Sequence, residues 1–332
     1  MAIASLPKIE LHLHLEGAAP PNFIKDRALQ KNIDISKIFN SDGSYKFNDF
    51  NDFLSVYETA TSVLNTPTDF YDLTVSVLEE SVKSNVVYSE VFISPEFCGG
   101  NDIAAWKEFL AAIREASEYC ESKLGIISRG IVTCIRHLGP EVAKDAAKCA
   151  IETSGNWVVG FGMAGDESVG SPKDYVDSFR MASEAGLHLT SHAGEWGGAI
   201  SVRDTIHEIG VKRIGHGVQA VSDPNLVKLI VERGIVLETC PGSNVFLGVY
   251  PSLSSHPIKK LREQGVKVTI STDDPPFFQT SMNKEYESMA RTFDWNENVF
   301  VELNRVAIDA AFCDAETKEI LRGHFMIPDN LL

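Results

Sequence analysis

Short β-branched apolar runs alternate with longer amphipathic stretches along most of the chain. An apolar run of about 4–8 residues is typical of a buried strand, whereas apolar residues at every third or fourth position predict a helix with one buried face. From about residue 85 onward the two patterns alternate as in successive βα units, and one further run precedes them. We therefore predict eight strands, at residues 8–15, 85–94, 128–136, 156–165, 187–195, 212–218, 234–241 and 267–273.

Helix boundary signals occur between these runs. In SPKDYVDSFRMASEAG, Ser171 is expected as the N-cap, Pro172 stands at the first helical position and Gly186 follows the last turn. SDPNLVKLIVERG, which starts at Ser222, shows the same order of signals. Eight strands that alternate with helices predict an α/β fold, the (β/α)8 TIM barrel, and we expect residues 1–332 to form one domain.

One segment departs from this rhythm. Between about residues 20 and 72, after the first predicted strand, FNDFNDFLSVYETATSVL carries Phe50, Phe53, Leu54 and Tyr57 at helical spacing. An insertion at this point lies over the mouth of a barrel, so we expect a lid, although such an apolar stripe is also typical of a helix that simply packs on the barrel. After the last strand, the sequence predicts two or three closing helices.

Composition restricts the classes of function. Of the 332 residues 44% are hydrophobic, and the formal net charge is −16 without a cluster of Lys and Arg. Nucleic-acid binding is therefore not expected, because a phosphate backbone requires a basic surface. The start MAIASLPKIELHLHLEG lacks the features of a signal peptide, and no run reaches about 18 apolar residues, so we expect a cytoplasmic protein with no membrane partner. The six cysteines lack C-x-x-C spacing and are expected to be reduced and structural.

The spacing G-x-G-x-x-G occurs at Gly160, Gly162 and Gly165. In a dinucleotide-binding turn the third glycine opens a helix whose N-terminus binds pyrophosphate. Here two acidic residues follow Gly165 and would repel that group, and no helix is expected before Ser171. We therefore assign the motif to the fourth barrel strand.

The first strand carries two histidines. In ELHLHLEG, His12 and His14 lie two residues apart, so both imidazoles project from the same face of the strand and can reach one metal ion. A lone histidine on a strand is usually a core residue. A pair at this spacing, at the end of the first barrel strand, predicts metal binding.

Further polar residues follow the carboxyl ends of later strands: His192 and Glu195 in TSHAGE, His216 in RIGHG, and Asp273 and Asp274 in STDDPP. These ends meet at one mouth of a barrel, so we expect the side chains to converge there. Two histidines from the first strand, one from the fifth and one carboxylate from the eighth form an N3O set with an open position, as in a catalytic zinc site. The remaining acid and base groups suit hydrolysis.

Taken together, PKIELHLHLEGA, AGDE, SHAGE, RIGHG, ETCPGSN and TISTDDPPFF resemble the ordered motif set of the adenosine deaminase family, over about residues 5–280. The resemblance implies a zinc-dependent barrel enzyme with one Zn2+ per chain. It also implies a reaction in which the 6-amino group of adenosine or deoxyadenosine is replaced by hydroxyl and ammonia is released.

The resemblance assigns a role to each matching residue. It places zinc on His12, His14, His192 and Asp273, catalysis on Glu195, His216 and Asp274, and substrate contacts on His14, Glu16, Gly165 and Asp274. In that arrangement Glu195 protonates purine N1 and makes C6 electrophilic, while His216 accepts or orients the proton of the water on the metal. Asp274 orients that hydroxide and meets purine N7, and the Gly165 N–H donates to N3.

The exact substrate is less constrained by the motifs. Gly162 stands where the family commonly has aspartate, and Glu16 stands where many members have a ribose-contacting aspartate and related adenine deaminases have glutamate. AGDE and RIGHG favour a nucleoside, because adenine deaminases tend to differ in both motifs. We therefore expect adenosine, with adenine or a 5′-modified adenosine, such as aminodeoxyfutalosine, methylthioadenosine or S-adenosylhomocysteine, as alternatives.

Two other functional classes fit less well. A metal-dependent hydrolase of amides, lactones or phosphoesters is disfavoured, because the fourth strand has no lysine that could be carboxylated and bridge two metals. A binding protein without catalysis is disfavoured by the presence of every acid and base group described above. We therefore expect an enzyme that acts on a small purine.

Overall fold

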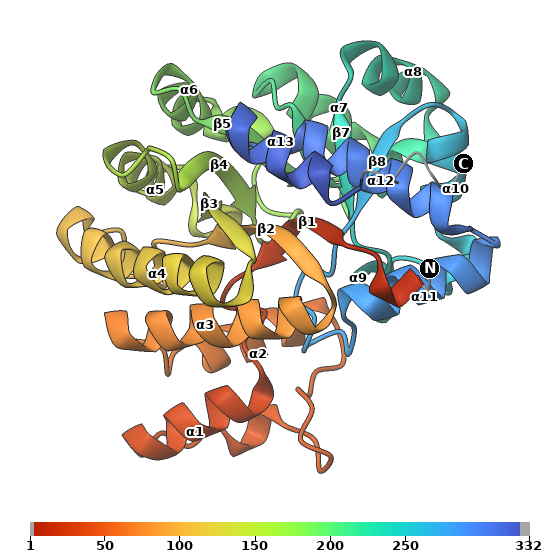
Figure 1. The fold of residues 1–332 in the computed structure, drawn as a ribbon. Coiled ribbons are helices and arrows are strands. Elements are labelled where there is room, and N and C mark those ends of the chain that lie inside the picture. The colour runs from red at the N-terminus through yellow and green to blue at the C-terminus, as the bar shows by residue number, and fades with distance from the viewer. Residues whose placement is uncertain (1–2, 326–332) are drawn as a thin grey trace.

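Eight parallel strands form the centre of the computed structural model, which describes residues 3–325 (Figure 1). They pair in chain order, each with the next. Their bounds are β1 Lys8–His14, β2 Val86–Ile93, β3 Ile127–Ile135, β4 Val158–Ala164, β5 His188–Ala193, β6 Arg213–His216, β7 Val236–Thr239 and β8 Lys267–Ile270. The eight predicted strands are confirmed, with ends that differ by a few residues.

The barrel closes where the residues after β8 meet β1. Leu13 and Asp273 form a parallel bridge. The His14 N–H donates to the carbonyl of Asp273 at 3.1 Å, and the Asp273 N–H donates to the carbonyl of His12 at 3.1 Å. These hydrogen bonds fix the backbone of Asp273 directly against the carboxyl end of β1.

Helices between the strands pack on the outside of the barrel and complete the predicted (β/α)8 fold. They are α3 Pro67–Lys83, α4 Ile103–Leu124, α5 Pro140–Glu152, α6 Val176–Glu184, α7 Gly198–Glu208, α8 Pro224–Arg233, the short α9 Pro241–Phe246 and α10 Ile258–Glu263. In α4, for example, Trp106, Leu110 and Ile113 recur at every third or fourth position and are all buried. This spacing aligns one apolar face with the sheet.

Two helix starts differ in detail from the expectation. Ser171 forms a reciprocal capping box, but the first turn after it, Pro172–Tyr175, is a 3-10 helix, and α6 begins only at Val176. The N-cap of α8 is Asp223 and not Ser222, because the Asp223 carboxylate accepts the first free backbone N–H groups of that helix.

The segment between β1 and α3 contains the helices α1 Pro21–Lys31 and α2 Phe50–Thr61, which lie at the same end of the molecule (Figure 1). The ring of Phe53 in α2 lies 5.3 Å from that of Phe278 and 5.4 Å from that of Phe277, both in the segment after β8. Tyr57 contacts Phe97, which follows β2, at 5.9 Å. Helix α2 therefore covers the carboxyl end of the barrel, as expected for a lid.

Three helices close the chain: α11 Met282–Phe293, α12 Glu297–Ala310 and α13 Ala315–Gly323. Helix α11 packs beside β8, and α12 packs beside both β8 and β1. In α12 the side chain of Asn304 is fully buried. Its Oδ1 accepts the N–H of Ile9 at 2.9 Å, and its Nδ2 donates to the carbonyl of Phe300 at 2.8 Å. This amide therefore ties α12 to β1, at the opposite end of the strand from His14.

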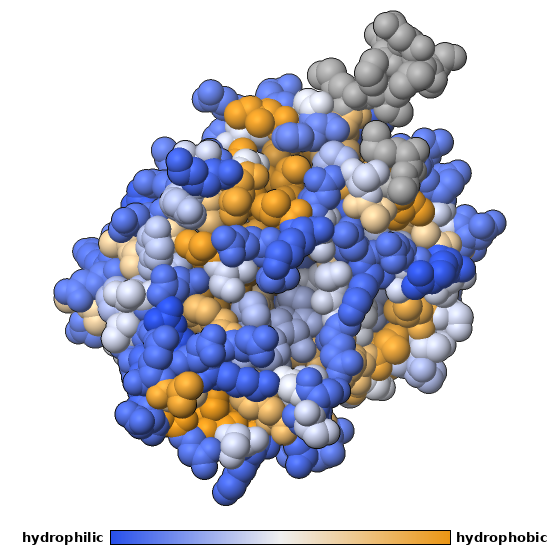
Figure 2. Space-filling view, turned by 60° about the horizontal axis from the view of Figure 1, so that its bottom comes forward, coloured by the Kyte–Doolittle hydropathy of each residue, from blue (hydrophilic) through white to orange (hydrophobic). Residues whose placement is uncertain are grey.

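The surface and the cysteines agree with the composition. All six cysteines are buried and free. None of the described helices combines the length and apolar character that a membrane crossing requires. On the face shown in Figure 2, hydrophilic residues predominate and apolar ones form separate patches.

Candidate active site

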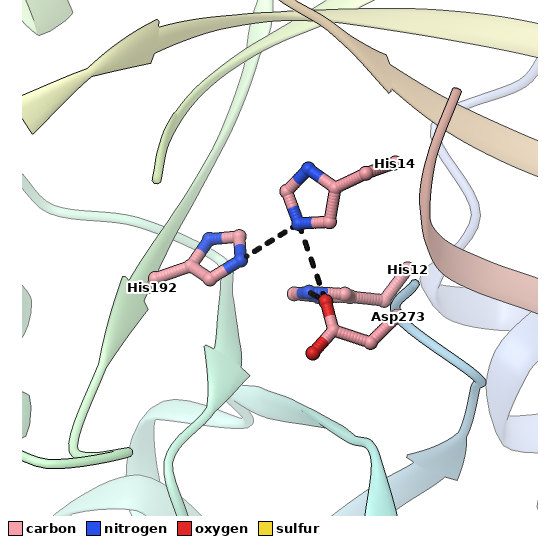
Figure 3. Close-up of side chains that lie close together, drawn as sticks. All are labelled: His12, His14, His192 and Asp273. Atoms are coloured by element: carbon pink, nitrogen blue, oxygen red, sulfur yellow. Dashed lines mark hydrogen bonds and ion pairs between the residues drawn. The ribbon is translucent and has the colours of Figure 1, made fainter. Parts of the chain in front are cut away.

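Four predicted metal ligands converge at the carboxyl end of the barrel. His12 and His14 come from β1, His192 comes from β5, and Asp273 follows β8 (Figure 3). The Nε2 atoms of His14 and His192 lie 3.1 Å apart, and the Nε2 atoms of His12 and His14 each lie 3.3 Å from Oδ1 of Asp273. One atom from each residue lies within 4.8 Å of all the others, which is the spacing of a single metal site.

Contacts at Nδ1 orient the rings of His12 and His192. Nδ1 of His12 lies 2.9 Å from a carboxylate oxygen of Glu238, and Nδ1 of His192 lies 2.9 Å from the carbonyl of Met163. Both contacts hold a proton on Nδ1, so that Nε2 presents its lone pair to the centre of the cluster. Nε2 of His12 is buried and has no hydrogen-bond partner among the described residues. An orphaned nitrogen in an N3O set fits a divalent cation such as zinc.

The charges around the cluster favour a cation. Burial lowers the pKa of His14 and of His192, so both rings are neutral. Burial also acts against a charge on His12, but Asp273 and Glu238 outweigh it and raise the pKa of His12 to about 9. Without an ion the two carboxylates thus draw a proton to the same place, which shows a local preference for positive charge.

Buried ion pairs with Arg213 hold the carboxylate of Glu238 in place. Its Oε1 accepts from Nε of Arg213 at 2.5 Å, and Nη1 of Arg213 donates to Glu90 at 2.5 Å. Burial alone would raise the pKa of Glu238, but Arg213 and His12 lower it to about 2. Glu238 is therefore ionised and holds His12 firmly. Glu238 is the first residue of the motif ETCPGSN, but no role was predicted for it.

The expected acid and base groups border the predicted metal ligands. Nε2 of His216 lies 3.7 Å from Glu195 Oε2 and 3.8 Å from Asp273 Oδ2. Burial, together with the charges of Asp273 and Glu167, raises the pKa of Glu195 well above its usual range, which favours the protonated form of this carboxyl group. Burial lowers the pKa of His216 to about 4, which keeps the ring neutral. Oδ1 of Asp274 is buried without a hydrogen-bond partner in the described part of the chain.

Hydrogen bonds to the carboxylate of Glu167 hold the loop that carries Glu195. The Glu167 carboxylate accepts the backbone N–H groups of Glu195, Trp196 and Gly197 at 3.0, 2.8 and 2.9 Å, and it also accepts from Gly194 and from the hydroxyl of Ser201. Glu167 belongs to AGDE, but no role was predicted for it, because a sequence does not show which loop a carboxylate will reach.

Two site residues have an unusual backbone. His216 has φ 60° and Asp273 has φ 70°, in the left-handed region that non-glycine residues rarely adopt. Such conformations persist only where the surroundings enforce them, and they cluster at functional sites. At these positions they turn both side chains into the mouth of the barrel.

Two polar residues of ETCPGSN complete the site. The hydroxyl of Ser243 donates to Oδ2 of Asp273 at 2.7 Å. Nδ2 of Asn244 lies 3.3 Å from Oε1 of Glu195 and 3.2 Å from Nδ1 of His216. Both residues sit on the short helix α9, where no periodic pattern marks their side chains as part of the site.

A cavity adjoins the cluster of His12, His14, His192 and Asp273. It is lined by polar residues, by Gly165 and by aromatic and apolar residues. The aromatic and apolar residues are Phe50, Phe53, Leu54, Tyr57, Phe97, Ile135, Leu138, Ala164, Leu247 and Phe278. Gly165 has φ +97°, and a Cβ there would lie 2.8 Å from Nδ1 of His137, so the position requires glycine. The α2 side chains that line this cavity include the four of the predicted lid stripe, together with Glu58.

Glu16 and Gly162, the two positions that differ from the common family pattern, do not line the cavity. Burial raises the pKa of Glu16 to about 7, and its Oε1 accepts the N–H of Ser94 at 3.2 Å. Gly162 packs inside the barrel, where a Cβ would lie 3.3 Å from Thr133 Oγ1. Substrate contact by Glu16 stays a prediction.

The rim between α2 and the Glu195 loop is aromatic. The rings of Phe50 and Trp196 lie 5.7 Å apart. Trp196 is 42% exposed, whereas the other tryptophans, Trp106, Trp157 and Trp295, are at most 7% exposed.

Comparisons with known proteins agree with this geometry. A family model described as adenosine deaminase matches residues 7–326. The adenine deaminase of Rhizobium leguminosarum bv. trifolii is 44% identical over 317 residues, which cover 95% of this chain and 98% of that protein. The crystal structure of adenine deaminase from Arthrobacter aurescens matches with a TM-score of 0.89 at 25% identity and covers 97% of this chain and 98% of its own. An amidohydrolase from Burkholderia ambifaria with bound Zn has the same fold, with a TM-score of 0.85 at 24% identity over 97% of this chain and 90% of its own.

Proposed function

We propose that this chain, which belongs to the adenosine deaminase family, hydrolyses free adenine to hypoxanthine and ammonia. The enzyme is a purine aminohydrolase of that family. The observation that supports adenine as the substrate is the 44% identity, over 95% of this chain, to a relative that is an adenine deaminase. The structural similarity to the adenine deaminase of A. aurescens points in the same direction.

This proposal reverses the order of substrates expected from the motifs. AGDE and RIGHG favoured adenosine, which remains the second candidate on that observation. Similarity to adenine deaminases over nearly the whole chain outweighs two short motifs, because it extends over the segments that form the lid and the cavity wall.

His12, His14, His192 and Asp273 are proposed to hold one zinc ion. Zinc in such a site supplies a hydroxide nucleophile at neutral pH by lowering the pKa of water. The open side of the N3O set adjoins the cavity, so the attacking oxygen and the purine would meet there.

The protonated Glu195 is proposed as the general acid. Its proton passes to the purine nitrogen next to C6, which draws electrons from C6 while the attacking oxygen bonds to that carbon. The hydroxyl proton of the added oxygen then passes to the amino nitrogen, the C6–N bond breaks and ammonia leaves, while the oxygen stays on C6 as a carbonyl. The other proton of the attacking water restores the acid form of Glu195. Asp274 and His216 border the attacking oxygen and orient it, and the Gly165 N–H contacts the purine edge.

A side-by-side rate comparison tests the substrate. Zinc-loaded protein is assayed for ammonia release from adenine, adenosine, 2′-deoxyadenosine and 5′-modified adenosines. We expect kcat/KM for adenine to exceed that for adenosine by about tenfold or more, as for a pocket that must reject an added group. A higher kcat/KM for adenosine would overturn the adenine proposal in favour of the second candidate.

A further inference from the structure

Asn244 lies between the two groups assigned to proton handling and has no role in the mechanism above. Its side chain is fully buried. Nδ2 contacts Glu195 Oε1 at 3.3 Å and His216 Nδ1 at 3.2 Å, while Oδ1 lies 3.2 Å from Nε2 of His256. One amide thus touches both reactive groups and a third residue behind them.

The orientation of this amide follows from one backbone N–H. The Ile258 N–H donates to Nδ1 of His256 at 3.3 Å. Burial lowers the pKa of His256 to about 3, so its ring is neutral and, with Nδ1 accepting, carries its proton on Nε2. That Nε2–H donates to Oδ1 of Asn244. The reversed amide would set its NH2 group against this N–H, so Nδ2 must face the reactive groups.

The two hydrogens of Nδ2 then determine where two other protons lie. One hydrogen reaches Nδ1 of His216, which must accept, so the neutral ring carries its proton on Nε2. The other reaches Oε1 of Glu195. A carboxyl group accepts best at its carbonyl oxygen, which leaves the acidic proton on Oε2.

We propose that Asn244 and His256 are positioning residues that set the proton positions on Glu195 and His216. His216 then presents an Nε2–H toward Asp273 and the site, so it acts at that atom as a donor that orients an anionic oxygen. It does not take up a proton there. Glu195 presents the proton that the purine receives on one defined oxygen. This inference rests on the proposed function, because it specifies how these two groups act in that reaction.

The tautomer is measured directly by NMR of zinc-loaded protein with 15N-labelled histidine. Signals are assigned by their loss in His216→Asn and His256→Gln proteins. We expect Nε2 protonated and Nδ1 unprotonated in both rings of the wild type. Asn244→Asp has a carboxylate that cannot donate, so in this variant His216 should shift toward protonation at Nδ1. A wild-type His216 protonated at Nδ1 would overturn the proposal.

Kinetics test the consequence for catalysis. For Asn244→Asp we expect kcat to fall by about 100-fold with KM changed by less than about threefold, because the loss concerns proton transfer and not binding. His256→Gln keeps an N–H donor and should retain kcat within about fivefold. His256→Phe removes the donor and should lose about as much as Asn244→Asp. Equal kcat values for the two His256 variants would contradict the chain of hydrogen bonds.

Asn304→Asp is the matched control. It alters another fully buried amide, one that ties α12 to β1 and lies away from the cavity. We expect a lower Tm and an unchanged kcat. An equal loss of kcat in the Asn244→Asp and Asn304→Asp proteins would mean that Asn244 acts only through stability.

The substrate proposal and this inference are tested by different measurements. If another purine is deaminated faster than adenine, the adenine proposal fails and the variants are compared on that purine. The NMR measurement uses no substrate, so its result decides the proton positions in either case.

Discussion

The carboxylate of Glu167 accepts the backbone N–H of Glu195, at 3.0 Å. It holds the next two N–H groups of the loop in the same way. Burial would raise the pKa of Glu167, but the bonds from Ser201 and from the loop amides lower it, so the acceptor is an anion and the hydrogen bonds are charge-assisted. One buried side chain therefore positions the proposed general acid.

Glu167→Gln should loosen that loop. A glutamine has one acceptor oxygen and turns its NH2 group toward other N–H donors, which leaves buried groups unpaired. We expect a loss of about 2–4 kcal/mol in the free energy of unfolding and a kcat lower by about tenfold, with unchanged zinc content. Thermal unfolding, metal analysis and initial rates measure the three quantities. The neighbouring Asp166→Asn is the control, and a wild-type Tm for Glu167→Gln would refute the prediction.

Gly17→Ala should displace Asp274. A Cβ at Gly17 would lie 1.6 Å from Oδ1 of Asp274 and 2.8 Å from the ring of Tyr57. Because Asp274 is proposed to orient the attacking oxygen, we expect kcat to fall by about 100-fold or more. Gly155→Ala, where a Cβ meets no atom within 4 Å, should leave kcat unchanged. Equal rates for the two variants would show that Asp274 is not needed at that position.

Glu195→Gln should separate metal binding from proton transfer. The amide cannot supply the acidic proton, so we expect kcat to fall by about 100-fold or more, as for general acids elsewhere. Bound zinc should stay at the wild-type level, because Glu195 is not one of the four clustered ligands. Near-full activity of this variant would disprove the assignment of the acid.

Removal of the metal should destabilise the folded protein. The His12→Ala, His14→Ala double variant is expected to bind no zinc, because it removes two of four ligands. For the wild type, zinc at about 100–1,000 times its dissociation constant should stabilise the fold by about 3–4 kcal/mol, which a chelator reverses. The double variant should show the same Tm with and without zinc. A zinc-dependent Tm in that variant would place the ion elsewhere.

Glu96 should make stability depend on pH. No described donor reaches either of its buried carboxylate oxygens in hydrogen-bond geometry. Burial raises the pKa of Glu96 from 4.5 to about 7, although the nearby Ile135 amide and Asn101 offset part of the effect. Between these values the unfolded chain releases the proton and the folded protein keeps it. The contribution of Glu96 to stability therefore falls as pH rises through this window, and its full penalty is present above about pH 7.

Glu96→Gln removes the ionisation. We expect stabilisation by up to about 3 kcal/mol near pH 8 and little change near pH 4.5, measured as unfolding free energies at both pH values. The exposed Glu80→Gln serves as the control for loss of a carboxylate at the surface. A Glu96→Gln effect that does not grow with pH would contradict the raised pKa.

The barrel and the convergence of His12, His14, His192 and Asp273 were predictable for a physical reason. Most strands are short, largely apolar runs between helical stretches, and parallel strands in a barrel bring all their carboxyl ends to one mouth. His12, His192 and Asp273, which lie far apart in the sequence, meet for that reason alone. The lid helix followed from its aromatic spacing, because an insertion at this point has nowhere else to lie.

The supporting contacts were not predictable. Glu167, Glu238 and Asn244 lie within quoted motifs, yet their partners are set by packing between distant elements, which periodicity does not reveal. Glu16 and Gly162 are the opposite case, because the sequence marked them as positions near the substrate. Glu16 follows β1 but turns toward the amide of Ser94, and Gly162 lies within β4 and faces the barrel interior.

The contact between Trp196 and Phe50 gives the protein an optical reporter. Trp196 is exposed and lies next to Glu195 in the chain, while Phe50 begins the helix over the cavity. Indole emission depends on the polarity and the neighbours of the ring, and the other three tryptophans are shielded within the fold. A ligand that changes the spacing between α2 and the loop would therefore alter the fluorescence of one residue, so that binding can be followed without a label and without turnover.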